Sequence, residues 1–175
     1  MILALYEHRD GVETEEGNHV VYDVGANEAH FGAARVDGHA LRWELGADTG
    51  AKLAADVEPE DGWLMRCDRI DFPPGGVAYT HTHPGPGIRC LLFGSIRIES
   101  GGSTHEYGAF EPWFESGPEP VYAVASQREP SAFVRVMLLP PEWEGKRTIR
   151  YVDPADEDKP KLQKPTLFFD RRVVL

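Results

Sequence analysis

The sequence predicts an all-β fold, and three observations support that prediction. The chain has 18 glycines and 14 prolines in 175 residues, a content typical of short strands joined by turns. Short apolar stretches recur along it, each closed by glycine, proline, aspartate or asparagine, and only short helices fit between them. About ten strands in one domain must hide their edges, so we expect a closed barrel or a sandwich of two sheets.

The first third of the chain, residues 1–62, is expected to add strands outside the main fold. It holds 14 acidic and 4 basic residues, whereas residues 63–175 hold 15 acidic and 14 basic residues. The Asp37-Gly38 pair tolerates the positive φ angles of a tight turn, and predicts a hairpin between the stretches on its two sides. Residues 47–62 are expected to form a loop, with a short helical turn at 51–55. The strands expected here are residues 19–24, 31–36 and 40–45.

From Trp63 onward strand-like stretches follow one another closely, as expected for the main fold, residues 63–140. Two of them end in runs of proline and glycine, at residues 73–76 and 84–87. Gly94 lies inside the longest stretch, where a glycine often marks a bend or a bulge. The strands expected here are residues 63–72, 77–83, 88–99, 104–107, 110–115, 121–125 and 132–139.

The last part of the chain, residues 141–175, has a different character. Residues 142–164 are charged and rich in proline, which is typical of an extended, solvated connector. The connector leads to TLFFDRRVVL, residues 166–175, which is too apolar to be left in water. This arm either docks on its own barrel or adds a strand to the sheet of a second copy, and we expect a homodimer built by strand addition.

Charge and hydropathy exclude several classes of partner. The net charge of −11 argues against nucleic acid and against anionic membrane surfaces, both of which need a concentrated basic face. No apolar run is long enough to cross a bilayer, and the N-terminal MILALYEHRD has neither a basic leader nor a cleavage pattern. We therefore expect a cytoplasmic protein, with Cys67 and Cys90 as buried, reduced thiols.

One constellation points to chemistry, the pair His81 and His83. Strand alternation places Val77, Tyr79, His81 and His83 on one face, and two imidazoles one pleat apart can chelate a first-row metal ion. The alternative is that both histidines sit at the end of a strand and cap loops or face water.

The surroundings of this pair resemble a known family, the cupin superfamily of small β-barrels. Its first motif is Gly, five residues, His-x-His, three or four residues, Glu, six residues, Gly, and Gly75, His81, His83 and Gly94 occupy those places. The resemblance implies a single-domain cupin with a double-stranded β-helix, or jelly-roll, barrel, to which this chain adds N-terminal strands and a C-terminal arm. Cupins host many unrelated chemistries, so the family alone implies no reaction.

The sequence departs from the family pattern at two of the four usual metal ligands. The glutamate of the first motif falls on Gly87, which has no side chain. The second motif should supply a histidine from residues 108–125, yet this stretch has none, and the place falls on Glu119 or Val121. Glu115 or Glu119 could complete a set of two histidines and one carboxylate, a combination that suits non-haem iron. The alternative is that both glutamates lie in a solvated loop and bind no metal ion.

Arg89 lies two residues beyond the missing glutamate and is expected to share its face. A buried guanidinium needs a carboxylate or an anionic ligand, so we expect Arg89 to bind a small anion. The alternative is that Arg89 faces outward or pairs with an acid such as Asp68 or Glu115. Tyr79, Trp63, Trp113 and Phe93 could supply apolar walls for such a pocket.

Two functions from different classes follow. The first is a metal-dependent, dioxygenase-like enzyme in which His81 and His83 hold Fe, Mn, Ni or Zn, at low occupancy because two family ligands are missing, and act on an aromatic or small organic acid. The second is a metal-free or weakly metallated binding protein that recognises a small anion through Arg89, His81 and His83, with Tyr79 as a further substrate-binding residue. An isomerase with histidine as its base lies between the two, and residues alone do not decide whether the protein is an enzyme.

Overall fold

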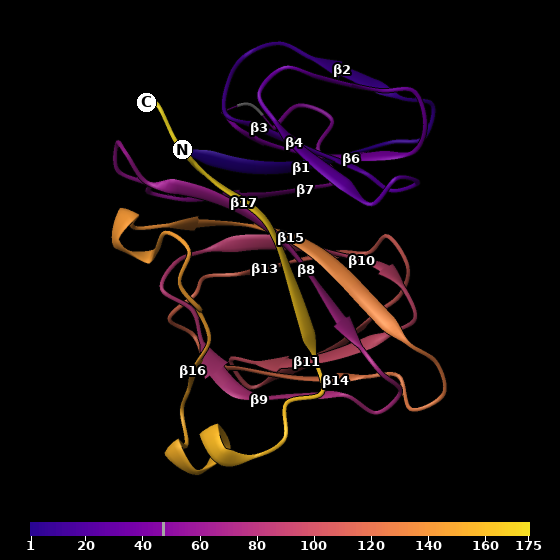
Figure 1. Cartoon of the computed structure of the whole chain (residues 1–175), viewed down its shortest axis with the longest axis vertical. Helices are drawn as coiled ribbons and strands as arrows, with labels where there is room; N and C mark the ends of the chain where they lie inside the picture. Colours follow the sequence, from indigo (N-terminus) through magenta and orange to yellow (C-terminus); the bar gives the residue numbers. More distant parts are fainter. Residues whose placement is uncertain (47) are drawn as a thin grey trace.

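The structure, a computed structural model, describes residues 1–46 and 48–175 and is built almost entirely from β-strands (Figure 1). Its helices among the described residues are two short 3₁₀ turns, η1 (Pro141–Trp143) and η2 (Pro154–Asp158). Within this part of the chain there is no helix of the length and apolarity needed to cross a membrane.

Eight consecutive strands form the barrel. The first sheet contains the order β13-β10-β15-β8 and the second the order β12-β11-β14-β9, so the chain passes repeatedly from one sheet to the other. This order is that of a double-sheet jelly roll, and the predicted fold class is confirmed. The strands are β8 (Leu64–Phe72), β9 (Val77–Thr82), β10 (Gly87–Phe93), β11 (Ile96–Ser100), β12 (Ser103–Tyr107), β13 (Pro112–Glu115), β14 (Val121–Ala125) and β15 (Ser131–Leu139).

The long strand expected at residues 88–99 is in fact two strands, because the chain changes sheet at Gly94. Gly94 has a φ of +78°, and a Cβ atom there would lie 2.2 Å from Oγ of Ser131 and 2.5 Å from the carbonyl oxygen of Pro130. A glycine is therefore required on both conformational and steric grounds. The bend ends β10 in the first sheet and starts β11 in the second.

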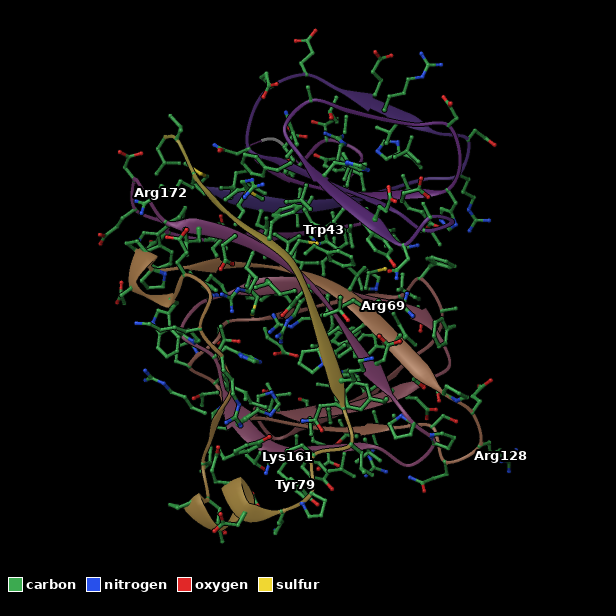
Figure 2. All side chains as sticks on the ribbon, in the orientation of Figure 1. Trp43, Arg69, Tyr79, Arg128, Lys161 and Arg172 are labelled. Atoms are coloured by element: carbon green, nitrogen blue, oxygen red, sulfur yellow. The ribbon has the colours of Figure 1, made fainter. Side chains whose placement is uncertain are left out.

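The N-terminal part forms a third sheet with the strand order β4-β3-β6-β1-β7. Alternate side chains of this sheet, among them Leu5, Tyr22 and Trp43, pack on the outer face of the first barrel sheet. Trp43 is fully buried between the two layers, and its Nε1 donates a hydrogen bond of 3.1 Å to the carbonyl oxygen of Ile88 (Figure 2). The strands are β1 (Ile2–His8), β3 (His19–Asp23), β4 (Glu28–Phe31), β6 (Ala40–Leu45) and β7 (Leu53–Asp56).

Two expectations for this region are wrong. The stretches flanking Asp37-Gly38 do not pair with each other: β5 (Ala34–Val36) pairs with β2 (Val12–Thr14), and β6 pairs with β1 and β3. This arrangement lets Val36 cover the face of the sheet turned away from the barrel. The helical turn expected at 51–55 is instead β7, because Leu53 and Ala55 alternate inward while the backbone pairs with β1. Ala47, the first residue of the expected loop, lies outside the described residues.

The C-terminal part returns to the barrel of its own chain. β16 (Arg150–Tyr151) pairs with β9 at the edge of the second sheet, and β17 (Lys164–Arg172) pairs with β8 at the edge of the first sheet. Phe168 and Phe169 of β17 also pack against rings of the N-terminal sheet. The structure therefore shows the arm docked on its own barrel, and the homodimer stays a prediction. Cys67 and Cys90 are free and buried.

Candidate functional site

A cavity of about 500 Å³ lies inside the barrel. Asp68 on β8 pairs with Arg135 on β15, and the place of this pair in the barrel is called the polar level below. Two residues further along the same two strands, the apolar Ile70 pairs with Phe133. The apolar lining consists mainly of Ile70, Phe72, Ala78, Ile98, Trp113, Val121, Ala123 and Phe133. The six polar residues Asp68, His81, His83, Arg89, Glu115 and Arg135, which lie at or behind the polar level, are called the polar cluster below.

His81 and His83 both line this cavity, as the spacing predicted, but the path of β9 differs from the expected one. Val121 pairs with His81 while Ala123 pairs with Ala78, so two residues of β14 span three of β9. This bulge turns Ala78 inward beside His81 and turns Tyr79 away from the cavity. The unbroken alternation that placed Tyr79 on the face of His81 therefore does not hold. The ring of Tyr79 instead lies 4.7 Å from Nζ of Lys159.

The bulge fixes the proton position on His81. Its Nδ1 lies 2.7 Å from the carbonyl oxygen of Tyr79, and since a carbonyl only accepts, Nδ1 donates. Burial lowers the pKa of His81, and the neighbouring Arg135 and Arg89 lower it further, against the opposing effect of Glu115. A neutral His81 protonated on Nδ1 keeps its lone pair on Nε2.

His83 has the opposite arrangement. Its Nε2 lies 3.3 Å from Nη1 of Arg135, which can only donate, so Nε2 accepts. Arg135 in turn donates to both carboxylate oxygens of Asp68, over 2.6 and 2.9 Å. Burial and the charge of Arg135 hold the pKa of His83 well below its ordinary value, so His83 is neutral at pH 7. The ring centroids of His81 and His83 are 4.9 Å apart.

Arg89 is fully buried behind the cavity and does not line it. Its Nη2 lies 2.7 Å from Oε2 of Glu115, and its Nη1 donates to the carbonyl oxygen of Gly87 over 2.7 Å. Burial lowers the pKa of Arg89 to about 10, against the opposing attraction of Glu115. Of the two arrangements expected for Arg89, the structure has the one in which it points inward and pairs with Glu115.

Similarity to known proteins is found among solved structures alone. No protein-family model matches the chain, and no curated protein matches it. Solved structures do: an RmlC-like cupin from Shewanella frigidimarina at 18% identity, with a TM-score of 0.39 over 50% of this chain and 86% of that chain. The polyketide cyclase RemF from Streptomyces resistomycificus matches at 20% identity, with a TM-score of 0.42 over 63% and 85%. An oxalate oxidase in complex with glycolate matches at 14% identity, with a TM-score of 0.42 over 85% and 87%.

The strand order of the barrel, with the His-x-His pair on β9 facing its interior, decides the fold. The chain has the cupin-type fold. The resemblance predicted from the sequence is thus confirmed at the level of the fold.

The places of the two missing cupin ligands are closed to metal-binding side chains. At Gly87 a Cβ atom would lie 2.5 Å from the carbonyl oxygen of Val136, so the first place has no room for a glutamate. Of the two candidates for the second place, Val121 pairs with His81 and presents an apolar side chain to the cavity. Glu119 is exposed on the loop before β14.

The carboxylates near the histidine pair are already engaged. Glu115 accepts from Nε1 of Trp113 over 2.8 Å and pairs with Arg89, while Asp68 is held by Arg135. Among residues 1–46 and 48–175, no three histidine, cysteine, aspartate or glutamate side chains are grouped closely enough to hold a metal ion. With Nε2 of His83 accepting from a permanent cation, these residues do not fit a protein-held metal.

Sequence reasoning found the two histidines but missed the residue that organises them, Arg135. The signal was present, because Arg66 and Asp68 share one face of β8, and Arg135 interrupts the apolar run of β15. It also missed the segment after β15, residues 145–163, which forms part of the cavity wall and is called the strap below. Trp63 and Phe93, expected as walls, lie elsewhere, whereas Trp113 does line the cavity.

Proposed function

We propose that this protein binds a small, mainly apolar organic molecule inside its barrel, without a metal ion held by the protein. A cavity of about 500 Å³ is within the range of small-molecule sites, roughly 300–1,000 Å³. Its lining is apolar with a few convergent polar groups, the usual composition of such sites.

The observation that carries this proposal is the charge balance of the polar cluster. The two carboxylates of Asp68 and Glu115 are matched by the two guanidinium groups of Arg135 and Arg89, and both histidines are neutral at pH 7. A cluster without net charge favours neither a free cation nor a free anion at this level of the cavity. It offers the lone pair on Nε2 of His81 as an acceptor and the remaining N–H groups of Arg135 as donors.

A fluorescence titration tests the proposal. N-phenyl-1-naphthylamine, a neutral aromatic probe that brightens in apolar surroundings, should bind the folded protein at a single site. The variant Ala123→Phe places a ring into the cavity from β14 and should abolish this binding, with Val121→Phe as a second variant should the first fail to fold. Equal binding by the wild type and by a folded, cavity-filled variant would overturn the proposal.

The hypothesis of a metal-dependent enzyme can be tested on the same protein. Elemental analysis of material purified without a metal column should find no stoichiometric Fe, Mn, Ni or Zn, and divalent ions should not raise the melting temperature. Near-stoichiometric metal in the wild type that is absent from the double variant His81→Gln, His83→Gln would support the metalloenzyme hypothesis instead.

The geometry of His81 supports a second candidate function, proton transfer to and from the bound molecule. A neutral imidazole whose Nδ1 is tied to a backbone carbonyl and whose Nε2 carries a lone pair is arranged as a general base. A bound molecule with an acidic C–H should then exchange that hydrogen in D₂O, and His81→Gln should stop the exchange while binding persists. Exchange that continues at the wild-type rate in the variant would exclude His81 as the base.

A further inference from the structure

The strap closes the seam between the edges of the two barrel sheets. It runs from the mouth of the barrel through β16, which pairs with the edge strand β9, and through η2 to β17, which pairs with the edge strand β8. In Figure 1 the strap descends along one side of the barrel and turns at the lower end. Side chains of Arg147, Tyr151, Glu157 and Lys161 from this segment line the cavity.

Specific polar contacts hold the strap in place. Arg66, which is buried, donates to both carboxylate oxygens of Asp170 on β17 and to the carbonyl oxygens of Trp143 and Lys146. Nζ of Lys161 donates to three carbonyl oxygens at the end of η2, those of Asp156, Glu157 and Lys159, over 2.5 to 2.8 Å. The positions of the charges on the strap are therefore set by the fold.

The strap carries a net positive charge where it meets the cavity. Four of its charged residues line the cavity, namely Lys146, Arg147, Glu157 and Lys161, and this set is called the rim below. Arg147 pairs with Glu157 over 2.6 Å, but the ammonium groups of Lys146 and Lys161 have no carboxylate partner among the described residues. The rim thus has two uncompensated positive charges, although the whole chain has a net charge of −11.

Large apolar side chains are exposed on the strap and on β17. Val152, Leu162 and Leu167 are 55%, 56% and 47% exposed, and they are among the few large hydrophobic residues left on the surface. Leu167 also lines the cavity. A rim of basic charges beside exposed apolar groups, above an apolar cavity, matches a molecule with an apolar body and an anionic end.

We propose that the ligand of the barrel is an amphipathic organic anion, whose apolar body lies in the cavity and whose acidic group lies at the rim beside Lys146, which is exposed and has no carboxylate partner among the described residues. This inference rests on the proposed function and specifies its ligand class. It places the anion at the strap rather than at Arg89, because Arg89 is buried and matched by Glu115, whereas the rim is accessible and has unmatched charge. The neutral polar cluster then contacts the middle of the ligand.

A matched pair of probes tests this inference. 1-Anilinonaphthalene-8-sulfonate has the ring system of N-phenyl-1-naphthylamine with one added sulfonate. The wild type should bind the sulfonate more tightly than the neutral probe, and added salt should weaken only the sulfonate. The variant Lys146→Gln should weaken sulfonate binding by about threefold to fivefold and leave the neutral probe unchanged. Arg147 is left in place because it pairs with Glu157.

A control variant separates a local effect from the net charge of the protein. Arg128→Gln removes one exposed charge from outside the rim, and should leave the affinity for both probes unchanged. If the two probes bind equally, or if the rim and control variants behave alike, the anion site is overturned while the cavity stands. If neither probe binds the wild type, or if a folded Ala123→Phe variant binds both probes as tightly as the wild type, the proposed function fails and this inference fails with it.

Discussion

Removal of the carboxylate of Asp68 should destabilise the fold strongly, because it leaves the guanidinium of Arg135 buried and unmatched. Their side chains are 7% and 9% exposed and are joined by two hydrogen bonds. Breaking a buried ion pair of this kind costs about 3–5 kcal/mol, a large share of the roughly 5–15 kcal/mol by which domains are stable. At a urea m value of about 2 kcal/mol/M, Asp68→Leu should lower the unfolding midpoint by about 1.5–2.5 M.

A double-mutant cycle measures the coupling in this pair directly. Arg135→Met in the Asp68→Leu background removes the stranded charge, so the double variant should be more stable than Asp68→Leu alone, with a coupling energy of at least about 2 kcal/mol. The same substitutions at Arg97 and Glu99, an exposed pair with a similar distance of 3.0 Å, should give a coupling within about 0.5 kcal/mol. The free energy of unfolding is measured by urea titration, with tryptophan fluorescence as the signal. Additive changes in this free energy for Asp68→Leu and Arg135→Met would refute a charge-balanced cluster.

Three further predictions concern other parts of the molecule. Folding lowers the pKa of His83, so below about pH 6.5 the unfolded chain binds a proton at this residue that the folded chain does not bind. The free energy of unfolding should therefore fall from pH 7 to pH 5. Urea titrations at both pH values should show a smaller fall in His83→Gln, and an equal fall would contradict this. Trp43→Ala should lower the free energy of unfolding by about 3–5 kcal/mol, because it empties the layer between the N-terminal sheet and the barrel; a loss below about 1 kcal/mol would show that the layer contributes little. Gly87→Glu, which reinstates the family's glutamate, should lower the melting temperature and create no zinc site, since its Cβ meets the backbone at Val136; a stable variant that binds zinc by calorimetry would contradict this.

The barrel could be predicted from the sequence because its signals are local. Proline and glycine runs mark the strand ends, and Gly75, His81, His83 and Gly94 keep the spacing of one motif. Gly94 was expected to mark a bend, and it marks the place where the chain changes sheet. The spacing of the motifs also showed that two metal ligands are missing, at Gly87 and in the second motif.

What escaped the sequence depends on contacts between distant segments. The bulge in β9 turns Tyr79 outward, and only the pairing with β14 reveals it. The hairpin expected at Asp37-Gly38 was predicted from local turn residues alone. In the structure β6 pairs instead with β1 and β3, in the sheet that covers the barrel. Arg135 is the one charged residue of β15, and only the pairing of β15 with β8 places Asp68 directly opposite it.

The measurement that tests the central claim most directly is a titration of N-phenyl-1-naphthylamine against the chelator-treated protein, with and without added Zn²⁺ or Mn²⁺. A charge-balanced, metal-independent pocket predicts the same dissociation constant under all three conditions. Binding that appears only when a divalent ion is added, and that requires His81 and His83, would contradict the account.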